Sequence, residues 1–175
     1  SRFRRAGRTL GVFYGAEHPH TAAAEMAFYR LLFFAESPDA PWPANAAEYS
    51  CFSVPVKTSR ALDLMREPFV AERAQWTDFA NYEPTQALAE AARIADAQLI
   101  RYESVRDPKH RANLALLSPL AFARRAPKRF ETWRIRVSRS GAQALRELPA
   151  ERHEFGRDAF ADDPRLKDMR WEARV

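Results

Sequence analysis

The chain has 175 residues, of which 46% are hydrophobic and 29% are charged, and its formal net charge is +5. This length and composition suit one globular domain and exclude a disordered chain. A single cysteine, Cys51, excludes a disulfide framework and any zinc site built on cysteine pairs, and the five glycines form neither GxGxxG nor GxxxxGK[ST], which argues against a Rossmann dinucleotide site and a P-loop.

The predicted elements mix strands and helices along the chain. Residues 9–16 are expected to form a short buried strand, because aromatic and β-branched residues lie between glycines. A turn at His18 then opens a helix that runs to Ala35, with Thr21 as its N-cap, and that ends before Pro38. The later elements are expected as strands over 48–56, 98–102, 112–117 and 130–138, a short apolar segment over 61–65 and a helix over 84–96. Without regular alternation of strand and helix, the pattern predicts an α+β fold in a single domain, 1–175, whose C-terminal part over 123–175 is rich in strands.

Apolar runs and cysteine content indicate the compartment. The longest apolar stretch, residues 22–35, is too short to span a bilayer and contains Glu25 and Arg30. No basic and then apolar signal segment opens the sequence, and a lone cysteine suits a reducing compartment. We therefore expect a cytoplasmic protein.

Positive charge concentrates between residues 101 and 139. Eleven arginines and lysines stand there against three acidic residues, which gives this segment a net charge of +8. Such a stripe attracts phosphates, either those of a nucleic acid or the pyrophosphate of a small molecule. A solvated face that meets an acidic protein partner is a third interpretation. Charge alone leaves these alternatives open.

One acidic residue interrupts the apolar first helix. Apolar residues surround Glu25 on nearly every side of this helix, so most of the helix should be buried. A buried carboxylate costs several kcal/mol unless a cation or hydrogen-bond donors meet it. Glu25 is therefore either part of a narrow stripe that faces solvent or a functional carboxylate aimed into a cleft beside a cation.

Two other segments supply candidate partners for that carboxylate. The N-terminal residues 1–5 carry three arginines, whose planar guanidinium groups suit pyrophosphate or a carboxylate, although such a run is also typical of a solvated tail. Ser104 and Arg106 follow the strand that ends at Tyr102, and strand ends often carry binding groups. No histidine lies in a nucleophile motif, so Ser104 suits hydrogen bonding to a substrate better than a Ser-His-Asp triad. His18 and His20 are more typical of a turn than of a metal site.

These motifs, in this order, resemble those of the RES-domain family, which is named for an Arg, a Glu and a Ser and consists of toxins from bacterial toxin–antitoxin pairs. The matching segments are Ser1–Phe3, Gly11–Ala16, Thr21–Glu25, Thr85–Leu88, Tyr102–Asp107 and Asn113–Pro119. The resemblance covers about residues 1 to 122. It places the three eponymous residues on Arg2, Glu25 and Ser104, and the family's pocket tyrosine on Tyr14. The spacing to Tyr14 fits Arg4 better than Arg2.

The resemblance implies a fold and a chemistry. The implied fold is that of ADP-ribosyltransferases similar to diphtheria toxin, in which small twisted sheets surround an NAD cleft with flanking helices. The implied substrate is NAD, and no metal is required. Glu25 would stabilise positive charge on the ribose, and Tyr14 would face the nicotinamide. Ser104 would offer a hydroxyl to the substrate, while Arg2, with Arg4 or Arg106, would hold the pyrophosphate.

The resemblance also implies partners. A toxin of this kind has a cognate antitoxin and, as a mono-ADP-ribosyltransferase, a protein that accepts ADP-ribose. The chain is most similar to the ParT-like branch, which is associated with modification of phosphoribosyl pyrophosphate synthetase. Other members degrade NAD by hydrolysis or phosphorolysis, so an NAD glycohydrolase or phosphorylase toxin is the first alternative. A non-enzymatic nucleic-acid-binding module that uses the basic stripe is the second.

Overall fold

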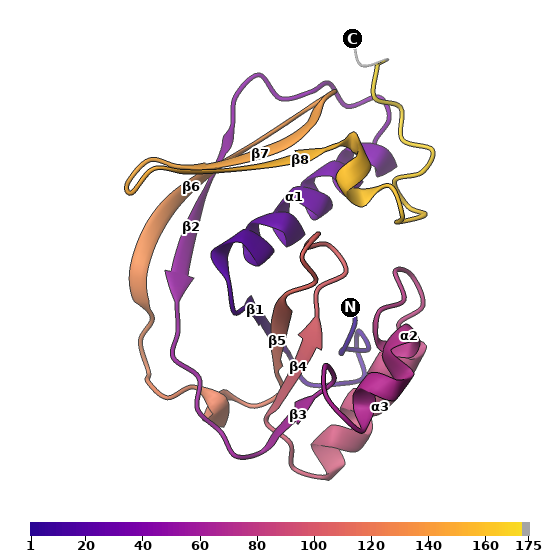
Figure 1. Cartoon of the computed structure of the whole chain (residues 1–175), viewed down its shortest axis with the longest axis vertical. Coiled ribbons are helices and arrows are strands. Elements are labelled where there is room, and N and C mark those ends of the chain that lie inside the picture. The colour runs from indigo at the N-terminus through magenta and orange to yellow at the C-terminus, as the bar shows by residue number, and fades with distance from the viewer. Residues whose placement is uncertain (173–175) are drawn as a thin grey trace.

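The computed structural model describes residues 1–172 (Figure 1). Its strands are β1 (Phe13–Ala16), β2 (Ala47–Ser53), β3 (Ala61–Asp63), β4 (Leu99–Glu103), β5 (Ala112–Leu116), β6 (Lys128–Ser138), β7 (Gly141–Arg146) and β8 (Glu151–Gly156). Its α-helices are α1 (Pro19–Glu36), α2 (Arg73–Trp76) and α3 (Glu83–Ile94), and short 3-10 turns are η1 (Phe69–Glu72), η2 (Pro119–Ala121) and η3 (Arg157–Phe160). The fold is therefore α+β, as the order of predicted elements indicated.

The described strands form two four-stranded sheets. The first has the order β1-β5-β4-β3, with β3 parallel to β4 and the other neighbours antiparallel. The second has the order β2-β6-β7-β8 and is antiparallel throughout. The hairpin between β6 and β7 turns at Gly141, whose φ is +123°. A side chain at Gly141 would collide with the carbonyl oxygen of Phe155, so only glycine fits there.

Helix α1 lies between the two sheets (Figure 1). It begins with Pro19, a residue suited to the first turn of a helix, and continues through a run of alanines. Phe28 and Leu31 pack in one apolar cluster with Trp133, Ile135 and other residues of the second sheet. On another side of α1, Ala22, Met26 and Tyr29 border a pocket, which accounts for part of the apolar surface around the helix.

The first sheet has a separate core. Phe3 of the N-terminal segment packs with Ile100 and Tyr102 of β4, and Ala89 and Ala92 of α3 cover the same cluster. Figure 1 shows α2 and α3 along one side of this sheet, with the N-terminus between them and the strands. The N-terminal residues are therefore part of the folded domain and not a solvated tail.

Most element boundaries agree with the sequence predictions. The predicted N-cap of α1 differs from the observed one. The first strand begins at Phe13, and α1 begins at Pro19 with His18 as its N-cap. His18 accepts a hydrogen bond from the backbone of His20, whereas Thr21 is fully buried and donates to Asp107 over 2.6 Å. The prediction of Thr21 as the N-cap was therefore wrong, because its hydroxyl group binds Asp107 and does not cap the helix. No helix within residues 1–172 is long and apolar enough to cross a membrane.

Candidate functional site

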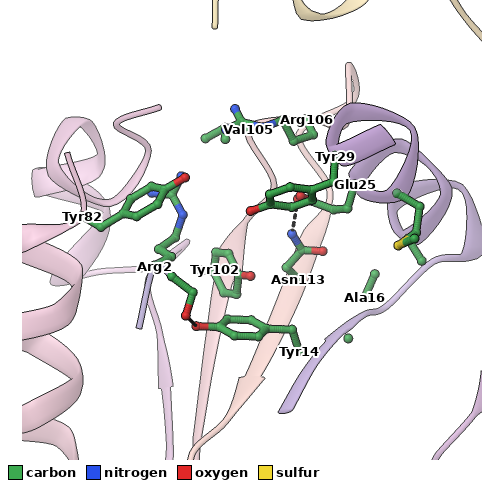
Figure 2. Close-up of a pocket in the computed structure, with 14 residues that line it drawn as sticks. Arg2, Tyr14, Ala16, Glu25, Tyr29, Tyr82, Tyr102, Val105, Arg106 and Asn113 are labelled. Carbon is green, nitrogen blue, oxygen red and sulfur yellow. Dashed lines mark hydrogen bonds between the residues drawn. The ribbon is translucent and has the colours of Figure 1, made fainter. Parts of the chain in front are cut away.

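A pocket of about 420 Å³ lies between α1, the first sheet and the N-terminal segment (Figure 2). Its walls are largely aromatic and apolar, with the rings of Tyr14, Tyr29, Tyr82 and Tyr102 among them. Two arginines, Arg2 and Arg106, also line it, and Glu25 is the only acidic residue among its described lining residues. Both the volume and the mainly apolar wall with a few polar groups are typical of a small-molecule site.

Glu25 presents one of its two carboxylate oxygens to the pocket. Oε1 accepts a hydrogen bond from Ser104 Oγ at 2.7 Å and another from Asn113 Nδ2 at 2.6 Å. No described residue donates to Oε2. Figure 2 shows Glu25 on α1 above Asn113 of β5, with the dashed line between them. Two donors on one oxygen fix the carboxylate, and the other oxygen stays available to a ligand.

Ser104 is held in place by the loop after β4. Its Oγ accepts hydrogen bonds from the backbone nitrogens of Arg106 at 3.2 Å and Asp107 at 3.1 Å. With those two donors on its lone pairs, the hydroxyl hydrogen of Ser104 points to Glu25. Ser104 is fully buried and does not line the pocket. The structure therefore places the hydroxyl of Ser104 against the carboxylate of Glu25 and not at the pocket surface, where the sequence interpretation expected it to meet a substrate.

Asp107 anchors the same loop to α1. Its carboxylate accepts hydrogen bonds from Thr21 at 2.6 Å, from the backbone of Lys109 at 2.9 Å and from Arg111 at 3.3 Å. Burial acts to raise the pKa of Asp107, but these hydrogen bonds and the charge of Arg111 hold it below its ordinary value. The helix that carries Glu25 and the loop that carries Ser104 are thus joined by a buried carboxylate.

Arg2 is built into the pocket wall by backbone carbonyls. Its Nη1 donates to the carbonyl of Trp76 at 2.7 Å and its Nη2 to that of Asp78 at 2.9 Å. The guanidinium also lies over the ring of Tyr82, 4.8 Å from its centre. Thr85 of α3 donates to the carbonyl of Arg2 at 2.7 Å, which gives the threonine of the Thr85–Leu88 motif a structural role. Arg2 therefore forms the side of the pocket opposite Glu25 (Figure 2).

Tyr14 and Arg4, the other two N-terminal candidates, differ in their placement. Tyr14 lines the pocket, and its hydroxyl accepts a hydrogen bond from the backbone of Phe3 at 3.0 Å. Arg4 is exposed and does not belong to the described pocket wall. The structure thus brings Arg2, and not Arg4, to Tyr14 and Glu25. Residues 1–9 fold into a series of turns and do not extend straight from β1, so spacing along the sequence does not measure the distance to Tyr14.

Arg106 reaches the pocket from the loop after Ser104. Its side chain is only 3% exposed, and its Nη2 lies 2.8 Å from Asp163. Burial lowers the pKa of Arg106 from its ordinary value, and the negative charge of Asp163 opposes this effect. The ring of Phe28 lies 3.9 Å from the guanidinium carbon. Arg106 is therefore a desolvated cation with one acidic partner, at the end of the pocket near Tyr29 (Figure 2).

Several pocket residues were missed by sequence reasoning. Asn113, Tyr29, Tyr82 and Tyr102 all line the pocket. Burial raises the pKa of Tyr102 well above its ordinary value, and the negative charge of Glu25 adds to the effect, so Tyr102 stays a neutral hydrogen-bonding group. A signal for Asn113 existed, because it is a polar residue in the otherwise apolar run of β5 and is buried.

The basic segment over 101–139 does not act as one free surface. Arg101 pairs with Glu17 and Asp63, and Arg111 pairs with Asp107. Four exposed cations for which the structure shows no ion pair among the described residues, Arg124, Arg125, Lys128 and Arg129, follow one another closely in the loop before β6 and at its start. Within residues 1–172, no group of three or more His, Cys, Asp or Glu side chains is placed to hold a metal ion.

An α+β domain whose pocket sets a carboxylate among aromatic rings and guanidinium groups has the features of a small-molecule-binding domain. A model of the RES domain family matches residues 1–138, which is most of the chain, so the protein belongs to the RES domain family. RES domains are associated with NAD-utilising toxins of toxin–antitoxin systems. A sequence search found no curated protein that matches this chain.

Proposed function

We propose that this RES domain is a toxin that consumes NAD and transfers ADP-ribose to a host protein. The proposal depends on the hydrogen bonding of Glu25 in the aromatic pocket. One carboxylate oxygen accepts from Ser104 and Asn113, and the other has no donor among the described residues. A fixed carboxylate of this kind can stabilise a developing positive charge without any rearrangement during the reaction.

The reaction that this carboxylate serves is cleavage of the bond between the ribose and nicotinamide. The bonding electron pair stays on the nicotinamide nitrogen, which leaves as a neutral molecule, and positive charge develops on the ribose. Glu25 stabilises this charge and accepts a hydrogen bond from a ribose hydroxyl. A nucleophilic side chain of the acceptor protein then forms a bond to the ribose carbon, and its proton passes to water. Among the described lining residues, Glu25 is the group suited to this role.

The remaining walls suit the other parts of NAD. Tyr14 and Tyr102 offer aromatic faces to a planar ring such as nicotinamide. Arg2 and Arg106 supply positive charge for the pyrophosphate. The side-chain donors thus replace the glycine-rich backbone that a Rossmann site uses, and no metal is needed for the charge. This arrangement supports a cleft of the kind found in ADP-ribosyltransferases similar to diphtheria toxin, which is the finer fold that we propose.

The proposal includes partners and a compartment. A cytoplasmic enzyme that consumes NAD poisons its own cell, so a cognate antitoxin must restrain it. The resemblance to the ParT-like branch makes phosphoribosyl pyrophosphate synthetase the first protein to test as acceptor of ADP-ribose. The exposed cations over 124–129 give an acidic partner surface a place to bind.

Hydrolysis or phosphorolysis of NAD is a second candidate function, and one observation favours it. Tyr29 borders the pocket and is half exposed, so water and inorganic phosphate have access to the site. In that case water or phosphate, and not a protein side chain, attacks the ribose carbon. Nucleic-acid binding by the basic segment has less support, because Arg101, Arg106 and Arg111 are engaged with acidic residues.

The decisive experiment follows NAD that carries a label in its adenylate half. The protein is incubated with labelled NAD, with and without bacterial lysate, and the products are separated. Label on a protein band supports transfer, and mass spectrometry identifies the acceptor. Label only in ADP-ribose or its phosphate supports hydrolysis or phosphorolysis. Intact NAD in both reactions would contradict the whole proposal.

A matched pair of variants tests the role of Glu25. Glu25→Gln keeps an oxygen that accepts from Ser104 and Asn113, so the fold is preserved while the charge is lost. We expect NAD turnover to fall about 100-fold or more, together with toxicity. Glu36→Gln, at the exposed end of the same helix, should leave turnover unchanged. A folded Glu25→Gln variant with full activity would remove Glu25 from the mechanism.

A further inference from the structure

The C-terminal segment beyond the family match packs against the helix that borders the pocket. The RES domain match ends at residue 138, and β7, β8 and η3 all follow it. Phe160, Leu166 and Met169 pack in the same cluster as Phe28 and Leu31 of α1. Figure 1 shows this segment, in yellow, beside α1. Residues outside the matched region are thus placed against the helix that carries Glu25.

Asp163 of this segment forms a buried ion pair with Arg106. Their side chains are 1% and 3% exposed, and Asp163 Oδ2 lies 2.8 Å from Arg106 Nη2. Arg165 also binds Asp163, with its Nη2 at 2.9 Å from Oδ2 and its Nε at 3.0 Å from Oδ1. Both arginines lie over Phe28, and Arg165 additionally donates to the carbonyl of Phe79 at 3.1 Å. One carboxylate therefore binds two guanidinium groups, and this cluster carries a net positive charge.

The pairing leaves a donor of Arg106 unused. Its Nη2 meets Asp163, and the carbonyl of Phe79 is at the limit of hydrogen bonding, 3.5 Å away. Its Nη1 is buried and has no hydrogen-bond partner among the described residues. Buried polar groups without a partner are rare in proteins and costly, so this nitrogen requires an explanation. Because Arg106 lines the pocket, a small movement of its side chain toward an anion bound there would give Nη1 the partner that it lacks.

Asp163 also determines where Arg106 points. Without an acidic partner, a buried guanidinium would turn toward solvent or lose its place between Phe28 and Phe79. Burial acts to raise the pKa of Asp163, but hydrogen bonds from Arg165 and the charge of Arg106 hold it below its ordinary value. Asp163 is thus ionised under ordinary conditions and holds Arg106 in this orientation.

We propose that Asp163 is a positioning residue that keeps the guanidinium group of Arg106 at the pocket wall for a phosphate-bearing ligand, so that the C-terminal segment supports the anion-binding end of the pocket. The proposal rests on the proposed function for the identity of the ligand, a dinucleotide with a pyrophosphate. It goes beyond that function because it assigns part of ligand recognition to residues outside the family match. Arg106 contacts the ligand, and Asp163 acts only through Arg106.

Binding measurements on the full chain test this role. NAD, inorganic pyrophosphate and nicotinamide riboside, which lacks phosphate, serve as probes in calorimetry. Asp163→Asn should weaken NAD and pyrophosphate binding about tenfold or more and leave the riboside within about twofold. KM for NAD should rise more than kcat falls. Asp162→Asn, an exposed neighbour, is the matched control and should bind all three probes normally.

A double-mutant cycle separates positioning from general structural support. If Asp163 acts through Arg106, Asp163→Asn should have no further effect on NAD binding in an Arg106→Met background. Equal loss of NAD and riboside binding, or an effect of Asp163→Asn that persists in that background, would overturn the proposal. Should Asp163→Asn fail to fold, Asp163→Glu keeps the charge and moves the carboxylate by one methylene. It should raise KM for NAD at least about threefold, and an unchanged KM would also overturn the proposal.

Pyrophosphate separates this proposal from the proposed function. If the wild-type chain binds pyrophosphate in an Asp163-dependent way but neither binds nor cleaves NAD, the anion site stands and the NAD function fails. If it cleaves NAD and Asp163→Asn changes nothing, the NAD function stands and the positioning role fails. If it binds neither NAD nor pyrophosphate, both fail.

Discussion

Ser104 lies behind Glu25 as seen from the pocket, with its Oγ 2.7 Å from Oε1 of the carboxylate. The serine is fully buried, and its hydroxyl accepts from two backbone nitrogens while it donates to Glu25. A serine in this place cannot meet a ligand in the pocket directly. Its contribution is to fix the direction in which Glu25 presents its free oxygen.

Replacement of Ser104 by alanine tests this indirect role. Glu25 loses one of two donors, and two buried backbone N–H groups lose their acceptor, so stability should fall by about 1–3 kcal/mol. We expect kcat to fall about 10- to 100-fold with a smaller change in KM, because ligand contacts remain. Ser50→Ala, on the exposed face of β2, is the control. Steady-state kinetics and urea unfolding measure both effects, and a Ser104→Ala enzyme with normal kcat would show that the hydroxyl is dispensable.

Asn113→Asp offers a sharper test of the hydrogen bond to Glu25. Asp has the same shape as Asn, but it places a second carboxyl group 2.6 Å from Oε1 of Glu25. Two carboxyl groups this close share a proton, and the protonated Asp then donates to Glu25 as Asn113 does. We expect the variant to work at low pH and to lose activity as pH rises and the shared proton leaves. A kcat profile between about pH 5 and 9 that matches the wild type would contradict this donor role.

The sequence predicted the pocket better than the contacts inside it. Glu25 was identifiable because a carboxylate in an apolar helix is costly unless it has partners, and Arg2 and Tyr14 were found through the family motifs. The indirect role of Ser104 was not predictable, since residue order does not tell which side of a carboxylate a hydroxyl occupies. Local spacing favoured Arg4, but turns at residues 1–9 change the distance to β1, and Arg2 is the arginine that lines the pocket.

The partners of Arg106 show a second limit of sequence reasoning. Asp163 and Arg165 follow it by more than fifty residues and lie outside the matched region. No periodicity or motif links such positions, because the ion pair exists only after β7 and β8 complete the second sheet and place the C-terminal segment against α1. Long-range pairs of this kind are set by packing, which a single sequence does not display.

Arg2→Lys and Arg4→Lys form a pair that assigns the N-terminal arginine. A lysine at position 2 cannot donate two fixed hydrogen bonds to the carbonyls of Trp76 and Asp78. We expect a loss of about 1–3 kcal/mol in stability and weaker NAD binding. Arg4 is exposed, so its replacement should change stability by no more than about 0.5 kcal/mol. Thermal unfolding and calorimetry with NAD compare the two variants. A larger loss of stability and NAD binding in Arg4→Lys than in Arg2→Lys would assign the pocket role to Arg4.

Acid should destabilise the protein through Asp107 and Asp163. Burial acts to raise the pKa of each carboxyl, but hydrogen bonds and neighbouring arginines hold both below their ordinary values. The unfolded chain, with aspartate pKa values of about 3.9, therefore binds more protons than the folded chain as pH falls. The stabilisation is fully present above about pH 5 and is lost as pH falls through 3.9 toward the lower folded-state values.

Urea unfolding at a series of pH values measures this loss of stability. The Asp107→Asn variant shows how much of the loss comes from Asp107. The variant lacks the titrating group, so its free energy of unfolding should fall less steeply below about pH 5. Its stability at neutral pH should be lower than that of the wild type, because Thr21 and Arg111 lose a charged partner. Asp162→Asn should keep the wild-type slope, since its side chain is exposed. A wild-type stability that stays level or rises between about pH 5 and 3 would mean that these two carboxylates do not gain from folding in their ionised form.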